Sequence, residues 1–115
     1  MICSAYFGEL SEERKADWKC EDDNPYNVLQ NPVNLGRKAY DLWYSGKNYF
    51  EEQIQIDWAS YAWKCTEAQM VKFLEETMTT LQWLVEDEKE ILETVRQYIK
   101  NHGNTEYGVV FIEEA

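Results

Sequence analysis

The sequence lacks paired cysteines, long apolar runs and a secretory leader. Cys3, Cys20 and Cys65 are an odd number of widely spaced cysteines without a CxxC pair, which argues against a disulfide scaffold and favours a reducing compartment. No stretch approaches the roughly 20 apolar residues that a membrane-spanning helix needs. The N-terminus has neither the basic region nor the apolar core of a signal peptide. We therefore expect a cytoplasmic protein.

The motifs of common enzyme classes are also missing. The sequence has no P-loop, GxGxxG or GxSxG. The only histidine, His102, falls in the last turn of an expected helix, where it favours the carbonyl ends, so we interpret it as a capping residue. A zinc site from the three cysteines and His102 lacks short paired spacings, and the acidic run 21–24 lacks the central Gly and closing Glu of an EF-hand loop. We expect no enzyme activity, metal or cofactor.

Basic residues are scarce beside acidic ones. The chain has 22 Asp and Glu against 11 Lys and Arg, for a net charge of −11. Acidic and basic residues number 7 and 3 in 1–31, 4 and 4 in 32–65, 8 and 4 in 66–102, and 3 and 0 in 103–115. The excess thus avoids the middle of the chain. Its field repels phosphate, which disfavours nucleic acid and anionic membranes as ligands, although solubility alone also explains an acidic surface.

Apolar and aromatic residues are plentiful. The 115 residues are 44% hydrophobic and include five Trp, eight Tyr and four Phe. This length and composition predict one domain over residues 1–115 with its own core, in which large rings supply much of the buried area.

In the first half of the chain the pattern predicts a strand, a short helix and a longer helix. Residues 1–7 read as a strand that Gly8 ends. Ser11 begins a short helix to about Trp18. A longer helix is expected over 31–46, with Asn31 as the N-cap and Pro32 at the first helical position.

The second half predicts three strands and two helices. Residues 49–58 alternate as a half-buried strand, a second strand follows a turn at 59–60, and 107–112 reads as the last strand. Thr66 and Gln69 form a capping-box pattern at the start of an apolar helical stripe.

A single helix over 67–101 would be roughly 50 Å long, against about 35 Å for a compact domain of this size. A break is therefore expected at Val85–Glu88, with Asp87 capping the second helix. The order β-α-β-(β)-α-α-β predicts an α+β fold, with a small, mostly antiparallel sheet and about three helices packed on one face.

Acidic runs and one aromatic stretch supply the candidate binding residues. Separate acidic clusters steer association with a basic protein and resemble the charge spacing of a phosphate backbone. The aromatic stretch 58–63 reads either as core packing or as a platform for a partner. The predicted partner-binding residues are Glu21, Asp22, Asp23, Glu86, Asp87, Glu88, Glu90, Trp58, Tyr61 and Trp63.

Small size, acidity and missing catalytic residues are typical of immunity proteins that neutralise toxic nucleases and of anti-CRISPR or other DNA-mimic inhibitors. The leading hypothesis is therefore an inhibitor of a basic, nucleic-acid-handling partner such as a nuclease, toxin or CRISPR effector. Two alternatives stay open: a cytosolic accessory interaction domain with no inhibitory role, and a small-ligand binder or enzyme that uses the aromatic stretch 58–63.

Overall fold

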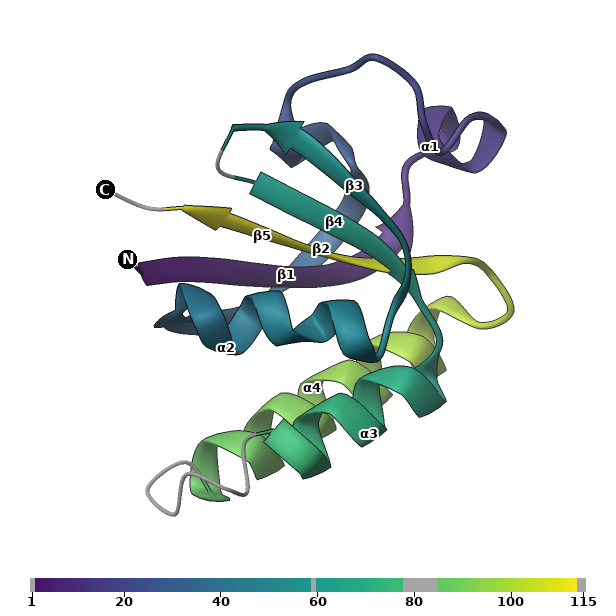
Figure 1. The fold of residues 1–115 in the computed structure, drawn as a ribbon. Helices are drawn as coiled ribbons and strands as arrows, with labels where there is room; N and C mark the ends of the chain where they lie inside the picture. Colours follow the sequence, from purple (N-terminus) through teal and green to yellow (C-terminus); the bar gives the residue numbers. More distant parts are fainter. Residues whose placement is uncertain (1, 59, 78–84, 114–115) are drawn as a thin grey trace.

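Within the part of the chain that the structure describes, five antiparallel strands form one sheet in the order β2-β1-β5-β4-β3. This computed structural model describes residues 2–58, 60–77 and 85–113. The first and last strands pair with each other at the middle of the sheet (Figure 1). The elements in chain order are β1 (Ile2–Leu10), α1 (Glu12–Ala16), the 3-10 turn η1 (Pro25–Asn27), β2 (Leu29–Ala39), α2 (Tyr40–Tyr44), the 3-10 turn η2 (Ser45–Asn48), β3 (Glu51–Asp57), β4 (Ser60–Cys65), α3 (Glu67–Thr77), α4 (Val85–His102) and β5 (Tyr107–Glu113).

The helices α2, α3 and α4 cover one face of the sheet (Figure 1). On the opposite face, Trp18 and Val28 from the segment after α1 pack against strand residues that include Ile56 and Val110. The expected α+β class, with an antiparallel sheet and helices packed on one face, is confirmed.

The helix expected over 31–46 is wrong for most of its length. Residues 29–39 form strand β2, and the helix α2 begins only at Tyr40. Because β2 is an edge strand, Pro32 removes no hydrogen bond that a further strand would need. Asn31, expected as the N-cap, instead has a positive φ of 48° within the strand.

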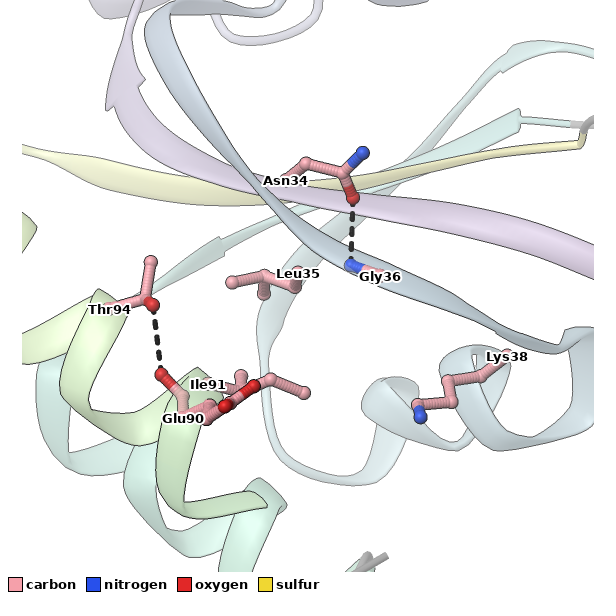
Figure 2. Close-up of a pocket in the computed structure, with 7 residues that line it drawn as sticks. All are labelled: Asn34, Leu35, Gly36, Lys38, Glu90, Ile91 and Thr94. Carbon is pink, nitrogen blue, oxygen red and sulfur yellow. Dashed lines mark hydrogen bonds between the residues drawn. The ribbon is translucent and has the colours of Figure 1, made fainter. Parts of the chain in front are cut away.

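Strand β2 is irregular, and the irregularity hid it from pattern analysis. Its register with β1 shifts twice, and Gly36 has φ 103°, a backbone conformation that favours glycine. The Gly36 N–H donates to the Asn34 side-chain oxygen at 2.7 Å, and Leu35 reaches from β2 towards Ile91 on α4 (Figure 2). These interruptions destroy the simple alternation by which a strand is recognised.

Gly8 does not end the first strand, which continues to Leu10. A Cβ atom at Gly8 would lie 3.0 Å from the Pro32 Cα and 3.1 Å from the Tyr98 hydroxyl oxygen. The glycine therefore permits β2 and α4 to approach β1 closely.

The local helix signals are confirmed where they involve side-chain caps. The Ser11 hydroxyl accepts from the Arg14 N–H at 3.2 Å and begins α1, which ends at Ala16 and not at the expected Trp18. At the start of α3, the Gln69 side-chain oxygen accepts from the Thr66 N–H at 2.9 Å, and the Thr66 hydroxyl accepts from the Gln69 N–H at 3.1 Å. This reciprocal pair is the expected capping box.

The expected break at Val85–Glu88 is wrong, because these residues lie within helix α4. Helix α3 ends at Thr77 and α4 begins at Val85, so the residues between them, 78–84, lie outside the described structure. Asp87 belongs to the first turn of α4 and is not its N-cap. The helix dipole favours carboxylates in a first turn, so the run 86–88 is as compatible with a helix start as with a break.

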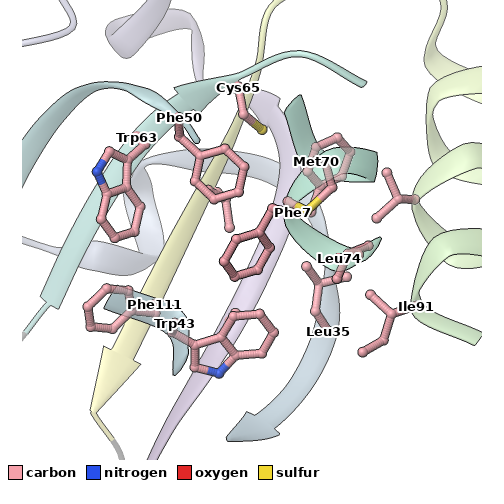
Figure 3. Packing of buried hydrophobic residues seen from close by; sticks show 14 of the residues in the cluster. Phe7, Leu35, Trp43, Phe50, Trp63, Cys65, Met70, Leu74, Ile91 and Phe111 are labelled. Atoms are coloured by element: carbon pink, nitrogen blue, oxygen red, sulfur yellow. The ribbon is translucent and has the colours of Figure 1, made fainter. Parts of the chain in front are cut away.

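Large aromatic rings form the core between the sheet and the helices. Phe7, Trp63, Phe73 and Phe111 are almost completely buried there (Figure 3). Trp43 of α2 stacks on Phe73 with ring centroids 6.1 Å apart. Truncating such a buried ring to alanine typically costs about 3–5 kcal/mol, so these contacts fix how the helices sit on the sheet.

Candidate protein-binding surface

The acidic segment after α1 is organised by a buried cation. Arg14 is only 3% exposed, and its guanidinium donates to three backbone carbonyls: Trp18 at 2.7 Å, Cys20 at 3.2 Å and Asp22 at 2.6 Å. Hydrogen bonds from a charged donor are roughly twice as strong as neutral ones. Arg14 therefore fixes the backbone that carries the acidic residues 21–23.

Asp22 closes the same segment from the other side. Its carboxylate accepts from the Asn24 N–H at 2.9 Å and from the Asn27 side-chain amide at 3.1 Å. These hydrogen bonds, the one from Asn24 first, hold the pKa of the Asp22 carboxyl below its ordinary value. The Asp22 carboxylate is therefore ionised at neutral pH, and these hydrogen bonds hold it in one position.

Trp18 ties the segment to the beginning of β3. Its indole N–H donates to the Glu52 carbonyl oxygen at 2.6 Å. The Lys64 ammonium lies 3.0 Å from a Glu52 carboxylate oxygen and 5.8 Å from the centre of the Trp18 ring. This contact places Glu51 and Glu52 beside the acidic segment.

A β-bulge turns both of these glutamates outward. Glu52 has φ 54°, and the pairing of β3 with β4 shifts register between Glu51 and Ile54. As a result Glu51, Glu52 and Gln53 are all exposed, where regular alternation would direct one of them inward. A non-glycine residue in the left-handed backbone region carries roughly 1–2 kcal/mol of strain. The surrounding structure therefore imposes the bulge on the strand.

Two separate clefts are lined by several of these residues. The first, of about 340 Å³, is lined by residues 19–22 and by the β3 residues 53–56, together with Arg14. The second, of about 390 Å³, brings Glu51, Glu67 and Glu106 together. The second cleft lies at the end of the sheet where β4 leads into α3 and α4 leads into β5, whereas the first lies along β3 beside the segment after α1. We define the acidic end as Glu12, Glu13, Asp17, Glu21, Asp22, Asp23, Glu51, Glu52, Glu67 and Glu106.

Most basic side chains at the acidic end already contact carbonyl or carboxylate groups of this chain. Arg14 is buried against carbonyls, and Lys64 is bound by Glu52. The Lys15 ammonium pairs with Glu9 and, at 3.5 Å, with Glu12; the hydrogen bond that it donates to the Glu9 carboxylate is the main reason that the pKa of Lys15 is raised. Lys19 is exposed. Nine of the ten carboxylates of the acidic end are exposed, and Asp22 is half-buried, so this surface is strongly negative.

The two acidic clusters expected from the sequence do not lie together. Glu21, Asp22 and Asp23 belong to the acidic end. Glu90 is exposed near the beginning of α4, about 20 Å along the helix axis from Gly103, which lines the second acidic cleft. A third cleft, of about 330 Å³, lies beside Glu90, between α4 and β2 (Figure 2).

The remaining residues of the predicted α4 cluster are Glu86, Asp87 and Glu88, and their side chains lie outside the described part of the structure.

The expected aromatic platform is divided among three environments. Trp58 is 83% exposed at the far end of β3, about 20 Å along the strand from Glu51. Tyr61 is half-buried and stacks on Phe111 with ring centroids 5.4 Å apart. Trp63 is 1% exposed and belongs to the core. The stretch therefore presents Trp58 to solvent and uses Trp63 for packing.

Seven carboxylates of the acidic end and one aromatic neighbour were not predicted as binding residues: Glu12, Glu13, Asp17, Glu51, Glu52, Glu67 and Glu106, together with Tyr26. Glu51 and Glu52 fall in the segment that charge counting scored as neutral, and Glu67 and Glu106 are isolated in the sequence. Only the fold brings Glu51, Glu67 and Glu106 together around one cleft. Tyr26 is 64% exposed next to the acidic segment. The signal in the sequence that could have indicated it is an aromatic residue directly after the acidic run and Pro25.

Other kinds of site were sought in the same structure. Within the described residues, no group of three or more His, Cys, Asp or Glu side chains is placed to hold a metal ion. The three cysteines are free. The His102 Nδ1–H donates to the Tyr98 carbonyl oxygen at 2.8 Å, at the end of α4 where a capping residue was expected. None of the helices in the described ranges has the length and apolar character required to cross a membrane.

Comparisons with known proteins were made at three levels. Neither the protein-family models, nor the curated proteins, nor the solved structures gave a match.

Proposed function

We propose that this protein binds and inhibits a basic, nucleic-acid-handling protein through its acidic end. The observation that carries the proposal is that carboxylates from distant segments line two clefts: residues 21 and 22 line the first, and one residue each of β3, α3 and the α4–β5 loop line the second. Apart from the segment 17–23, none of these segments is strongly acidic over its whole length. Their convergence favours a function for the charge beyond general solubility.

The physics of association supports this use of the surface. A negative patch with fixed charges steers a basic protein into contact and raises its association rate by about 10- to 1,000-fold at low salt. A nucleic-acid-handling protein carries such a basic surface, because it must neutralise phosphates. Arg14 and Trp18 hold the backbone that carries these carboxylates, so this backbone loses little conformational freedom on binding, which reduces the entropic cost of association.

Tyr26 is the proposed aromatic anchor of this surface. It is exposed beside the acidic segment, and its ring lies edge-on to Tyr6 with centroids 6.4 Å apart. Tyrosine offers a large, rigid contact area and is enriched among residues that dominate binding energy. The proposal also includes a cytoplasmic location, which the free cysteines support.

Affinity capture from the native host tests the proposal. The tagged protein is incubated with lysate at low and at physiological salt, and retained proteins are identified by mass spectrometry. The expected result is a basic nuclease or other nucleic-acid-handling protein, retained more strongly at low salt and inhibited by the purified chain. Capture of an acidic or neutral partner whose retention does not change with salt would rule the proposal out.

The second candidate is an accessory interaction domain, and exposed Trp58 favours it. A ring that is 83% exposed at the tip of the β3–β4 hairpin is a ready apolar contact. For this function, Trp58→Ala is expected to abolish capture while salt has little effect. For the acidic end, Trp58→Ala leaves capture unchanged and Tyr26→Ala weakens it.

A further inference from the structure

We propose that the second cleft of the acidic end receives an arginine side chain of the partner; this inference rests on the function proposed above. The cleft lies where β4 leads into α3 and where α4 leads into β5, and its volume is about 390 Å³. This is near the lower limit of the roughly 300–1,000 Å³ typical of small-molecule sites. The size suits one long side chain better than a folded segment.

The rim of the cleft carries carboxylates from three different parts of the chain. Glu51 comes from β3, Glu67 from the first turn of α3, and Glu106 from the loop before β5. Within the described residues, no ion pair is formed by any of the three. Lys64, the cation in the lining, is already 3.0 Å from Glu52. The rim therefore has uncompensated negative charge on several sides.

The floor of the cleft is apolar. Cys65 and Tyr107 are buried and Ile99 is half-buried beneath the carboxylates. Burial raises the pKa of the Cys65 thiol, which keeps it neutral and part of this floor. Arginine matches such a site because its methylene stem packs on apolar surface while its charged head stays among polar groups.

The C-terminal end of α4 adds to the preference for a cation. Helix α4 has 18 residues and ends at the cleft, where Gly103 donates to the Ile99 carbonyl oxygen at 2.8 Å. The carbonyl end of a helix carries a partial negative charge of about half an electron. Arginine is favoured over lysine because its planar fork bonds carboxylates in pairs, which suits acidic groups arranged around a rim.

The test uses acetyl-arginine amide as the probe, followed by ¹H–¹⁵N NMR titration of the intact chain. Acetyl-citrulline amide, which has nearly the same shape without the charge, is the control ligand. Saturable shifts confined to amides at 65–67 and 103–107 are expected with arginine and absent with citrulline. Shifts spread over all acidic segments, or equal shifts with acetyl-lysine amide, would overturn the assignment of this cleft to arginine.

Paired variants separate the cleft from the rest of the acidic end. Glu67→Gln with Glu106→Gln removes two rim charges, and Glu12→Gln with Glu13→Gln removes two charges outside the cleft. The first pair is expected to weaken probe binding at least tenfold, because both residues line the cleft. The second pair does not line it and is expected to change binding less than about twofold, because salt screens charges that lie further from the probe. Spectra unchanged away from the substitutions show that both variants fold.

Partner capture distinguishes the two proposals. If charge reversal at Glu21 and Asp23 abolishes capture but the Glu67→Gln and Glu106→Gln pair does not, the cleft inference fails and the proposed function stands. If neither change affects capture, both are wrong.

Discussion

The Arg14 guanidinium determines the shape of the acidic segment that follows it. It replaces water for the carbonyls of Trp18, Cys20 and Asp22, and these three bonds set the path of the chain over the end of the sheet. A positive charge thus lies beneath a negative surface. Exposed carboxylates can therefore lie close together without ion pairs to flexible surface lysines, which contribute little to stability.

Replacing Arg14 by methionine is expected to lower the free energy of unfolding by about 3 kcal/mol, because buried carbonyls lose their donors. The matched control is Lys15→Met on the same helix, which removes the same charge from a partly exposed position and is expected to cost less than about 1 kcal/mol. Urea unfolding followed by tryptophan fluorescence measures both. Equal losses would show that Arg14 does not organise the segment.

Tyr40 provides a pH-dependent test of packing at the edge of the core. Burial, followed by its hydrogen bond with Tyr61, raises the pKa of Tyr40 to about 12. A raised pKa means that folding favours the neutral phenol. Its contribution to stability is therefore complete below the unfolded pKa of 10.0 and is lost as the pH rises towards 12.

This sign is checked by NMR titration of labelled tyrosine rings and by unfolding at alkaline pH. The Tyr40 ring resonance is expected to shift well above pH 10, and Tyr40→Phe is expected to make stability fall less steeply between pH 10 and 12. Some decline remains in the variant, because burial also raises the pKa values of Tyr98 and Tyr107. A Tyr40 midpoint near 10 would contradict the packing described.

At the scale of elements, signals carried by adjacent residues predicted structure well. The reciprocal cap of Thr66 and Gln69 depends on neighbours within one turn and is present. Strand β3 is also present, although its alternation holds only beyond the bulge, at 53–56. The prediction for strand β2 was wrong because its local signals are ambiguous. Asn31-Pro32 begins helices in many proteins, but it also fits an irregular edge strand. Pairing with β1 decides between a helix and a strand here, and this pairing depends on residues that are distant in the sequence.

The bulge at Glu52 gives an element-scale prediction. Because Glu52 has φ 54°, Glu52→Gly is expected to be more stable than Glu52→Ala by about 1 kcal/mol. Gln55, an exposed residue of the same strand, is the matched control: there glycine is expected to be less stable than alanine by about 0.5–1 kcal/mol. Thermal unfolding of the four variants measures the two differences. The same order at both positions would contradict the bulge.

For the whole molecule, the fold rearranges the charge that the sequence displays. Counting by segment placed the excess before residue 24, near 86–93 and at the C-terminal tail, with a neutral middle. The fold keeps the first cluster but joins it to Glu51, Glu52, Glu67 and Glu106. Charge runs are visible in a sequence, whereas charges that converge from distant segments are not, because their proximity depends on strand order and helix packing.

The most direct test of the account compares charge reversal at two places. One variant carries Glu21→Lys, Asp23→Lys and Glu51→Lys at the acidic end. The other carries Glu76→Lys, Glu90→Lys and Glu93→Lys on α3 and α4, and each variant changes the net charge by the same amount. Association with the captured partner is measured by stopped flow at low and at physiological salt.

The first variant is expected to associate at least tenfold more slowly than the original chain and to lose most of the salt dependence, while the second stays within about twofold. Equal slowing by both variants would mean that only net charge matters. No slowing by the first variant would mean that the acidic end is not the binding surface.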